Sequence, residues 1–451
     1  MRLVIVGGGP AGNRAASTAA RLGAEVTLVE RDVIGGGAHL WDCIPSKAMV
    51  ASGDALTALR RARSLGIDVT LADSRVDLPR VSARINDIWR SLNANIDDEL
   101  TSQGVRLIPG TARLLDESRV AVESQGAPEE VLEADALLLA MGSRPRVPGW
   151  AEVDGERILI SRQAYDLDAL PEHIVIVGSG VTGVEFVHIF NALGCEVTLV
   201  ASRRHVLPGK DPEVAYALEE ELVARGVTIL KGARAAGVER SAATATVHIE
   251  DGRSVTGSHV LLAIGSVPNT DACGLDAAGV KVLDSGHVPV DEFCRTNVSS
   301  IYAAGDVTDK MPLSSLAAAQ GRLVGYHVVG RPARPLDYGA VAQAIFTDPE
   351  IADVGVAEAE AFGQGRKIRV TKVPFGSNPK ALIEGQHSGF VKIVSDPLTG
   401  EVLGGSIVGA SAAELIAPIA LAVRSGLRLQ DLVDTFCVHP SLSESLADAA
   451  E

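Results

Sequence analysis

The chain has 451 residues, of which 46% are hydrophobic and 22% charged, and its formal net charge is −16. This length allows about three domains, and the composition excludes a mostly disordered chain. The acidic balance disfavours binding to nucleic acid or to an anionic membrane, because affinity for phosphate depends on clustered Lys and Arg.

Cysteine usage and hydropathy indicate where the protein works. The five cysteines are scattered without a CxxC pair, which favours a reducing compartment and argues against a disulfide framework. We predict no transmembrane anchor, because the most apolar stretch, residues 414–422, is interrupted by Glu414 and Pro418. No cleavable signal pattern precedes the first apolar run, so the expected location is the cytoplasm, and no metal site is predicted.

An internal repeat organises the first half of the chain. VIVGGGPAG at residues 4–12 reappears as VIVGSGVTG at 175–183, and LGAEVTLVE at 22–30 reappears as LGCEVTLVA at 193–201. Each copy is typical of a strand, a glycine-rich turn, a helix and a second strand. The strands are continuous apolar runs, as in parallel sheets covered on both faces. The repeat therefore predicts two βαβ units of nucleotide-binding type.

Both turns have the G-x-G-x-x-G spacing of a dinucleotide fingerprint. The first glycine allows the tight turn, the second lets the backbone approach a pyrophosphate, and the third lets the helix pack on the strand. The helix N-terminus then faces the phosphate charge. Two copies predict two dinucleotides, commonly a flavin beside a nicotinamide. The glycines are Gly7, Gly9 and Gly12 in the first copy and Gly178, Gly180 and Gly183 in the second.

The two copies differ where the second strand ends. Glu30 ends the first copy and suits a ribose 2′-hydroxyl, so this site should hold an adenosine without a 2′-phosphate. Ala201 replaces it in the second copy and is followed by Ser202, Arg203 and Arg204. Because guanidinium groups match phosphate well, the second site should prefer NADPH, with NADH also accepted. The alternative is that the two arginines are a solvated charge pair.

Three later segments fit the same organisation. ALLLAMGSRPR at 136–146 and VLLAIGSVPNT at 260–270 each place a strand before a small-residue turn, at an expected domain crossover. TNVSSIYAAGDVT at 296–308 ends a strand with an Asp that can meet the ribityl or pyrophosphate end of FAD. The cofactor-binding candidates in these segments are Gly142, Gly265, Gly305 and Asp306.

Together these features resemble the flavoprotein disulfide reductase family of lipoamide dehydrogenase and glutathione reductase. The resemblance covers essentially the whole chain and also rests on CIPSK at 43–47, FTDPEIADVG at 346–355, GFVKI at 389–393 and HPSLSE at 439–444. It implies an α/β protein with two Rossmann-like domains, for FAD and NAD(P), and a C-terminal α+β dimerisation domain in a homodimer. The implied bounds are 1–146 and 269–336 for the FAD domain, 147–268 for the NAD(P) domain and 337–451 for the dimer-interface domain.

The resemblance also implies the roles of several side chains. Lys47 would pair with Glu185 near the flavin and tune its electronics; alternatively, Glu185 is a first-turn acid favoured by the helix dipole. His439 and Glu444 match a dyad in which Glu orients His as a general acid–base for the other subunit's active site. They would alternatively be a relic packed at the interface. Gly36 is expected at the FAD.

One departure from the family pattern redirects the expected chemistry. Disulfide-reducing members carry two cysteines in a pattern like GGTCLNVGCIPSK, whereas this chain has GGGAHLWDCIPSK at residues 35–47. Cys43 matches the cysteine against the flavin, and Ala38 replaces the outer one, so the redox-active disulfide cannot form. Cys43 is then a charge-transfer thiolate or a small buried side chain. Cys437, two residues before His439, is the candidate substitute partner.

The sequence therefore predicts an FAD-dependent oxidoreductase that passes electrons from NADPH, or NADH, to a small acceptor, with a quinone as the first candidate. Lipoamide-dehydrogenase-like proteins that have lost the outer cysteine act as NAD(P)H:quinone reductases, and Trp41 could line a site for an aromatic acceptor. One alternative is a soluble pyridine nucleotide transhydrogenase, whose motif resembles GGGCTHWGTIPSKAL and shares a nearby His and Trp. The other is a flavin-bearing redox sensor or subunit with low turnover.

Overall fold

The structure, a computed structural model, describes residues 1–68, 70 and 76–451. These residues form two compact units, and each is described by itself. The first unit comprises 1–45, 82–146 and 266–336, and the second comprises the described residues of 46–81 together with 147–265 and 337–451.

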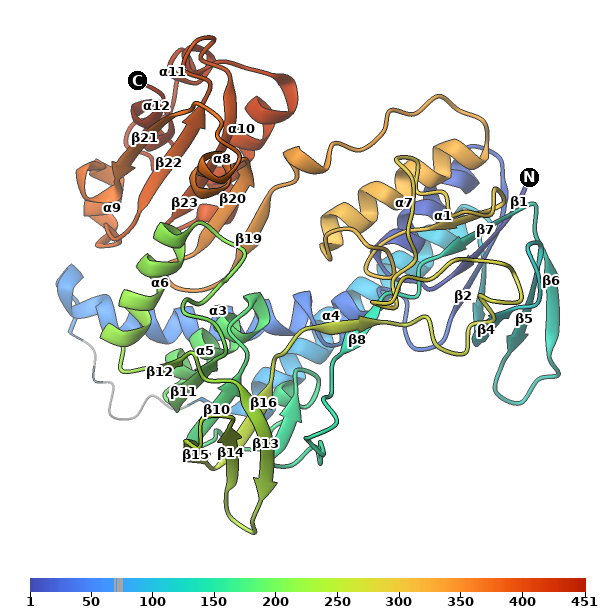
Figure 1. Cartoon of the computed structure of the whole chain (residues 1–451), viewed down its shortest axis with the longest axis horizontal. Helices are drawn as coiled ribbons and strands as arrows, with labels where there is room; N and C mark the ends of the chain where they lie inside the picture. Colours follow the sequence, from blue (N-terminus) through green and yellow to red (C-terminus); the bar gives the residue numbers. More distant parts are fainter. Residues whose placement is uncertain (69, 71–75) are drawn as a thin grey trace. The chain divides into compact units, whose positions relative to one another are not determined.

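The core of the first unit is a five-stranded parallel sheet, whose strands are, in order, β18 (Ile301–Ala303), β7 (Ala136–Leu139), β1 (Arg2–Val6), β2 (Glu25–Glu30) and β3 (Arg106–Pro109). All of β7 and most of β1 are buried, as continuous apolar runs predict. Helix α7 (Ser314–Val328) packs beside α1 (Pro10–Arg21) (Figure 1). A Cβ on Gly321 would lie only 2.0 Å from the carbonyl oxygen of Ala11, so glycine permits this approach.

Smaller elements complete the first unit. β4 (Thr111–Leu114), β5 (Arg119–Glu123) and β6 (Glu130–Glu133) form an antiparallel sheet, and β8 (Ser143–Pro145) pairs antiparallel with β17 (Ser266–Pro268). The four-residue helix α2 (Gly37–Leu40) precedes two long helices, α3 (Cys43–Arg61) and α4 (Leu78–Ser102), which contain residues of both units.

The second unit repeats the parallel design. Its first sheet has the order β12 (Thr228–Lys231), β11 (Glu196–Ala201), β10 (His173–Val177), β16 (His259–Leu262) and β9 (Ile158–Ile160). Helix α5 (Val181–Leu193) follows β10, and α6 (Pro212–Ala224) follows β11. An antiparallel sheet of β13 (Ala235–Arg240), β14 (Ala245–Ile249) and β15 (Ser254–Gly257) accompanies them (Figure 1). Two parallel βαβ sheets therefore confirm the fold class predicted from the repeat.

The C-terminal part of the second unit is an antiparallel sheet with helices. Its strands are, in order, β19 (Gln343–Ile345), β20 (Ile351–Gly355), β23 (Val402–Val408), β22 (Phe390–Ser395) and β21 (Arg369–Pro374). β22 and β23 are buried over their whole length. The helices are α8 (Glu358–Gly363), α9 (Pro379–Glu384), α10 (Ala412–Ser425), α11 (Leu429–Val433) and α12 (Glu444–Ala450).

The apolar stretch 414–422 lies in α10, which has 14 residues and contains Pro418. Across the described parts of the chain, no helix combines the length and hydropathy needed to cross a membrane.

Candidate functional site

The first glycine turn connects β1 to α1 at the carboxyl edge of the first parallel sheet. Gly7 has φ +105°, and a Cβ there would lie 2.3 Å from the Ala140 carbonyl oxygen. A Cβ on Gly12 would lie 1.9 Å from the Gly7 carbonyl oxygen. By contrast, a Cβ on Gly9 would meet no atom within 4 Å, so open space lies before the start of α1. This cradle fits the pyrophosphate of FAD, which needs close backbone approach at a helix N-terminus.

Two carboxylates stand at the same sheet edge. Glu30 ends β2 and accepts hydrogen bonds from the backbone N–H groups of Gly8, at 2.6 Å, and Asp32, at 2.7 Å. Asp306 follows β18 and accepts a hydrogen bond from Ser143 Oγ at 3.0 Å. Burial, and then the charge of nearby Asp42, raise the pKa of Asp306 above its ordinary value. An acid fixed beside the turn and a second acid at a neighbouring strand fit the ribose and ribityl ends of FAD.

Three further glycines predicted at cofactor sites adopt left-handed backbone conformations. Gly142 has φ +64°, Gly305 has φ +79° and Gly265 has φ +94°. The Gly305 N–H donates to Oε1 of Gln320 on α7 at 2.7 Å. This bond fixes the turn that presents the next residue, Asp306.

The segment that replaces the two-cysteine motif packs directly on the first glycine turn. Gly35 donates its N–H to the Gly8 carbonyl oxygen at 2.7 Å. A Cβ on Gly36 would lie 2.9 Å from Gly9 Cα, so glycine is required for this packing. Gly36 therefore lies beside the first glycine turn, and its role in FAD binding stays a prediction.

Cys43 begins helix α3. Its Sγ lies 3.1 Å from Ser314 Oγ at the start of α7, while Ala38 lies half-buried in α2. None of the five cysteines, all of which lie in the described residues, forms a disulfide. Cys437, the suggested substitute, has its Sγ 3.6 Å from the Ser443 carbonyl oxygen.

Sequence reasoning gave no role to a contact made by His39. Its Nδ1 lies 2.7 Å from Asn93 Oδ1 on α4, and a Cβ on Gly35 would lie 2.1 Å from the same nitrogen. Gly35 therefore makes room for the imidazole, and Asn93 fixes its orientation. Half-buried Trp41 lies against Gly37, whose Cβ would come within 3.2 Å of the indole nitrogen. The three consecutive glycines at 35–37 are the sequence signal that could have indicated this close packing of His39 and Trp41, whereas no local signal pointed to Asn93.

The second glycine turn, between β10 and α5, copies the first. Gly178 has φ +116°, with a would-be Cβ 2.1 Å from the Ala263 carbonyl oxygen, and a Cβ on Gly183 would lie 1.8 Å from the Gly178 oxygen. Gly180 again faces open space. This turn fits the pyrophosphate of a nicotinamide dinucleotide.

The loop after β11 has the composition predicted for a 2′-phosphate site. Ala201 is buried, whereas Ser202, Arg203 and Arg204 are exposed. The Arg203 carbonyl oxygen accepts the Gly232 N–H at 3.1 Å, which ties the loop to the end of β12.

The structure brings Lys47 and Glu185 together within the second unit. Lys47 Nζ lies 3.1 and 2.9 Å from the two carboxylate oxygens of Glu185. Oε1 also accepts the Phe346 N–H at 3.0 Å, and the Phe346 ring centre lies 4.7 Å from Nζ. The carboxylate of Glu185 is thus almost fully satisfied by these two partners.

His439 and Glu444 also meet. His439 Nδ1 lies 2.8 Å from Glu444 Oε1, and Ser441 N–H donates to Oε2 at 2.9 Å. The Ser441 bond, and then the His439 bond, lower the pKa of Glu444. The His439 side chain is 70% exposed, so its Nε2 side is open to a reactant. Phe436, next to this site in the chain, is fully exposed.

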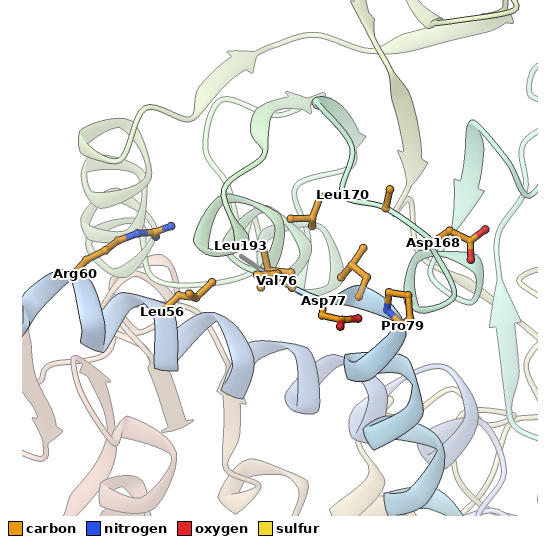
Figure 2. Close-up of a pocket in the computed structure, with 10 residues that line it drawn as sticks. Leu56, Arg60, Val76, Asp77, Pro79, Asp168, Leu170 and Leu193 are labelled. Atoms are coloured by element: carbon orange, nitrogen blue, oxygen red, sulfur yellow. The ribbon is translucent and has the colours of Figure 1, made fainter. Parts of the chain in front are cut away.

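A separate pocket of about 600 Å³ lies in the second unit, and Figure 2 shows it. Apolar side chains such as Leu56, Leu170 and Leu193 line it, with charge from Arg60 and Asp168. The residues predicted for catalysis or cofactor binding are not among its lining residues, so this cavity is distinct from the glycine cradles.

Comparisons with known proteins show which family the chain belongs to. Residues 1–321 match the family described as pyridine nucleotide-disulphide oxidoreductase, and residues 341–450 match its dimerisation domain. The chain belongs to the pyridine nucleotide-disulphide oxidoreductase family. It is thus an oxidoreductase of a group that binds FAD and NAD(P), and its C-terminal sheet is a dimerisation domain.

Several members of the pyridine nucleotide-disulphide oxidoreductase family match over nearly their whole length. An NAD(P)H dehydrogenase (quinone) of Mycobacterium tuberculosis is 44% identical over 458 residues, covering 100% of this chain and 93% of that protein. A dihydrolipoyl dehydrogenase of Bacillus subtilis is 34% identical, covering 100% of this chain and 98% of that protein. The crystal structure of LpdA from M. tuberculosis superposes with a TM-score of 0.95 at 43% identity, covering 100% and 99% of the two chains.

Proposed function

We propose that this protein transfers electrons from NADPH, and less efficiently from NADH, through FAD to a quinone-type acceptor without a redox-active disulfide. The observation that carries the proposal is Ala38 at the position that the resemblance assigns to the outer family cysteine, while Cys43 forms no disulfide and has its Sγ 3.1 Å from Ser314 Oγ. Disulfide exchange needs an attacking thiolate and a resolving thiol. A relative 44% identical over the whole chain is named NAD(P)H dehydrogenase (quinone), which supports this acceptor class.

The chain's own residues divide the work of holding the reactants. Gly7, Gly9 and Gly12 would hold the FAD pyrophosphate, and Glu30 its ribose. The bound flavin would supply the chemistry that accepts a hydride from the nicotinamide and returns the electrons to the acceptor. Lys47 would place a fixed positive charge near the flavin, because Glu185 holds its ammonium group by two short contacts.

His439 would supply a proton to the reduced acceptor. Glu444 accepts from Nδ1, which leaves Nε2 facing solvent in the single chain. In a homodimer this face would be completed by the partner subunit, consistent with the matched dimerisation domain and with exposed Phe436 and Val438. A quinone needs protons as it takes up electrons, so an oriented imidazole suits it.

The alternatives make different demands. A transhydrogenase would pass the hydride on to a second nicotinamide, but the family pattern of that enzyme lacks the inner cysteine, which is present here as Cys43. A low-turnover sensor has no need to select between nicotinamides, whereas the exposed Arg203 and Arg204 after β11 would suit such a selection.

Steady-state oxidation of NADPH and NADH by the FAD-loaded protein tests the proposal. Menadione and a benzoquinone are compared with lipoamide, oxidised glutathione and a thio analogue of NAD. Fast turnover with quinones and little with disulfides is expected, and a Cys43→Ser variant should keep quinone turnover. Disulfide turnover would contradict the proposal and implicate Cys437. Rapid reduction of the thio analogue would favour a transhydrogenase, and slow turnover with every acceptor a sensor.

A further inference from the structure

The end of strand β12 is joined to the loop that follows β11. Ala201 pairs with Lys231 in the parallel ladder. Beyond that pair, Gly232 donates its N–H to the Arg203 carbonyl oxygen at 3.1 Å, and Ala233 donates to Ala201 at 2.9 Å. Lys231 thus lies at the same carboxyl edge as the two exposed arginines, with its side chain 41% exposed.

A single buried carboxylate ties Lys231 to this loop. Glu219 on α6 has a side chain only 4% exposed, and its Oε2 accepts a hydrogen bond from Lys231 Nζ. Its Oε1 accepts the backbone N–H of Val206 at 2.9 Å, and His205 Nδ1 lies 3.7 Å from Oε2. A buried carboxylate without partners would destabilise the fold, so the Glu219 carboxylate should keep its contacts with Lys231 and Val206.

The far end of the loop is fixed to the second glycine turn. Val206 and Leu207 are buried, and Leu207 donates its N–H to the Ser179 carbonyl oxygen at 2.8 Å. Leu207 adopts φ +49°, a conformation that a non-glycine residue keeps only where surrounding contacts enforce it. The loop, the cradle for the pyrophosphate and the end of β12 therefore form one connected frame.

We propose that Lys231 is a third cation of the subsite for the adenosine 2′-phosphate, beside Arg203 and Arg204, and that Glu219 is the positioning residue that orients it. Glu219 takes one of the three ammonium donors of Lys231, which leaves two for phosphate oxygens. The Val206 bond to the same carboxylate sets the distance between lysine and loop. This inference rests on the NADPH preference in the proposed function.

The test measures nucleotide binding to the FAD-loaded protein without nicotinamide or acceptor. 2′,5′-ADP and 5′-AMP differ only in the 2′-phosphate, and calorimetry gives both dissociation constants. Lys231→Gln should weaken 2′,5′-ADP about 5- to 10-fold, as expected for one charge-assisted phosphate contact, and leave 5′-AMP unchanged. Lys367→Gln, an exposed lysine on the loop before β21, is the matched control and should change neither value.

The positioning role of Glu219 is tested by a pair of variants. Glu219→Leu removes both contacts and should lower the preference for 2′,5′-ADP over 5′-AMP. Glu219→Gln keeps an acceptor for the Val206 N–H and should restore most of that preference. Equal weakening of both nucleotides by Glu219→Leu would show a merely structural role and overturn this part of the inference.

The outcomes separate this inference from the proposed function. If the wild-type protein prefers 2′,5′-ADP but Lys231→Gln does not reduce the preference, the third cation is wrong and the NADPH preference stands. If the wild-type protein shows no preference, both are wrong. Loss of 2′,5′-ADP selectivity in Lys231→Gln supports the inference even where quinones fail as acceptors.

Discussion

Lys47 Nζ lies within 3.1 Å of both carboxylate oxygens of Glu185, and the Glu185 side chain is only 6% exposed. Among the described residues, Lys47→Met would leave this carboxylate with the Phe346 N–H as its remaining hydrogen-bond partner. We expect a loss of about 2–4 kcal/mol in the free energy of unfolding, because a buried charge stripped of its partner keeps its desolvation cost. The midpoint of urea unfolding of the FAD-loaded protein measures it.

A second substitution provides the control for this ion pair. Lys47→Met combined with Glu185→Leu removes both charges and should recover much of the lost stability. If the double variant is no more stable than Lys47→Met, the pair does not explain the effect.

Ala38→Cys tests the alignment of the altered motif. A thiol at this position should form a disulfide with Cys43, which NADPH then reduces through the flavin. Thiol titration of Ala38→Cys should find two more reactive thiols after anaerobic reduction by NADPH than before it, an increase that the wild-type protein should lack. Ala38→Ser is the control of similar size. An Ala38→Cys protein with the wild-type titration would mean that Ala38 does not occupy the outer position.

Arg203→Ala with Arg204→Ala tests the choice of nicotinamide. Losing two guanidinium groups should raise KM for NADPH about 30-fold or more. A 30-fold change corresponds to about 2 kcal/mol, and a single hydrogen bond between charged groups contributes about that much. KM for NADH should change little. Arg203→Lys with Arg204→Lys keeps the charge, so its KM for NADPH should lie between those of the wild-type protein and the double alanine variant. Equal effects on both nucleotides would contradict the 2′-phosphate assignment.

The sequence was sufficient for the parallel sheets, because strands buried on both faces appear as unbroken apolar runs, as β1 and β10 do. It was also sufficient for the glycine turns, where the spacing itself carries the steric requirement. The burial and the partners of side chains that contact residues far away in the sequence could not be predicted. Glu219 stands in a run with Glu220 and Glu221, and only packing determines which of the three is buried.

The same limit applies to contacts between distant segments. His39 and Asn93 are 54 positions apart, and no periodicity joins α2 to α4. Lys392 is part of buried strand β22, and its carboxylate partners are Asp211, which caps α6, Glu213 in α6 and Glu358 in α8. Such pairs follow from the tertiary fold, so they appear only once the sheets are assembled.

Lys392 itself gives a stability prediction. Its side chain is 2% exposed, and Nζ contacts carboxylates of Asp211 at 3.1 Å, Glu213 at 2.8 Å and Glu358 at 2.5 Å. Burial lowers the pKa of Lys392, but the bonds to Glu213 and Glu358 outweigh it and raise the pKa above its ordinary value. The part of its stabilising effect that depends on the lysine's own protonation is therefore complete at neutral pH, below the ordinary value of 10.5, and is lost as pH rises through the higher folded pKa.

Lys392→Met should lower the free energy of unfolding by about 3–5 kcal/mol at neutral pH, because the carboxylates lose their shared cation. The difference from the wild-type protein should shrink in acid, as Glu213 becomes protonated; burial raises the pKa of Glu213, but the hydrogen bonds from Lys372 and Lys392 outweigh burial and lower it. Thermal midpoints across the pH range measure both effects. Lys380→Met, on exposed α9, is the control and should have little effect. A constant difference at all pH values would contradict the electrostatic explanation.

Glu444 predicts a further pH dependence. The Ser441 N–H, and then His439, lower its pKa below the ordinary value of 4.5. A depressed pKa in the folded state contributes stability that is complete above that ordinary value and is lost as pH falls through the folded pKa. Glu444→Gln should therefore flatten the acid side of a plot of melting temperature against pH, whereas Asp448→Asn on the same helix should not. The ionised carboxylate accepts a hydrogen bond from His439 Nδ1 at neutral pH and so orients the imidazole. Glu444→Gln weakens this orientation, so it should lower kcat with quinones more than it changes KM for NADPH. Unchanged kcat would make the dyad a structural feature of the dimerisation domain.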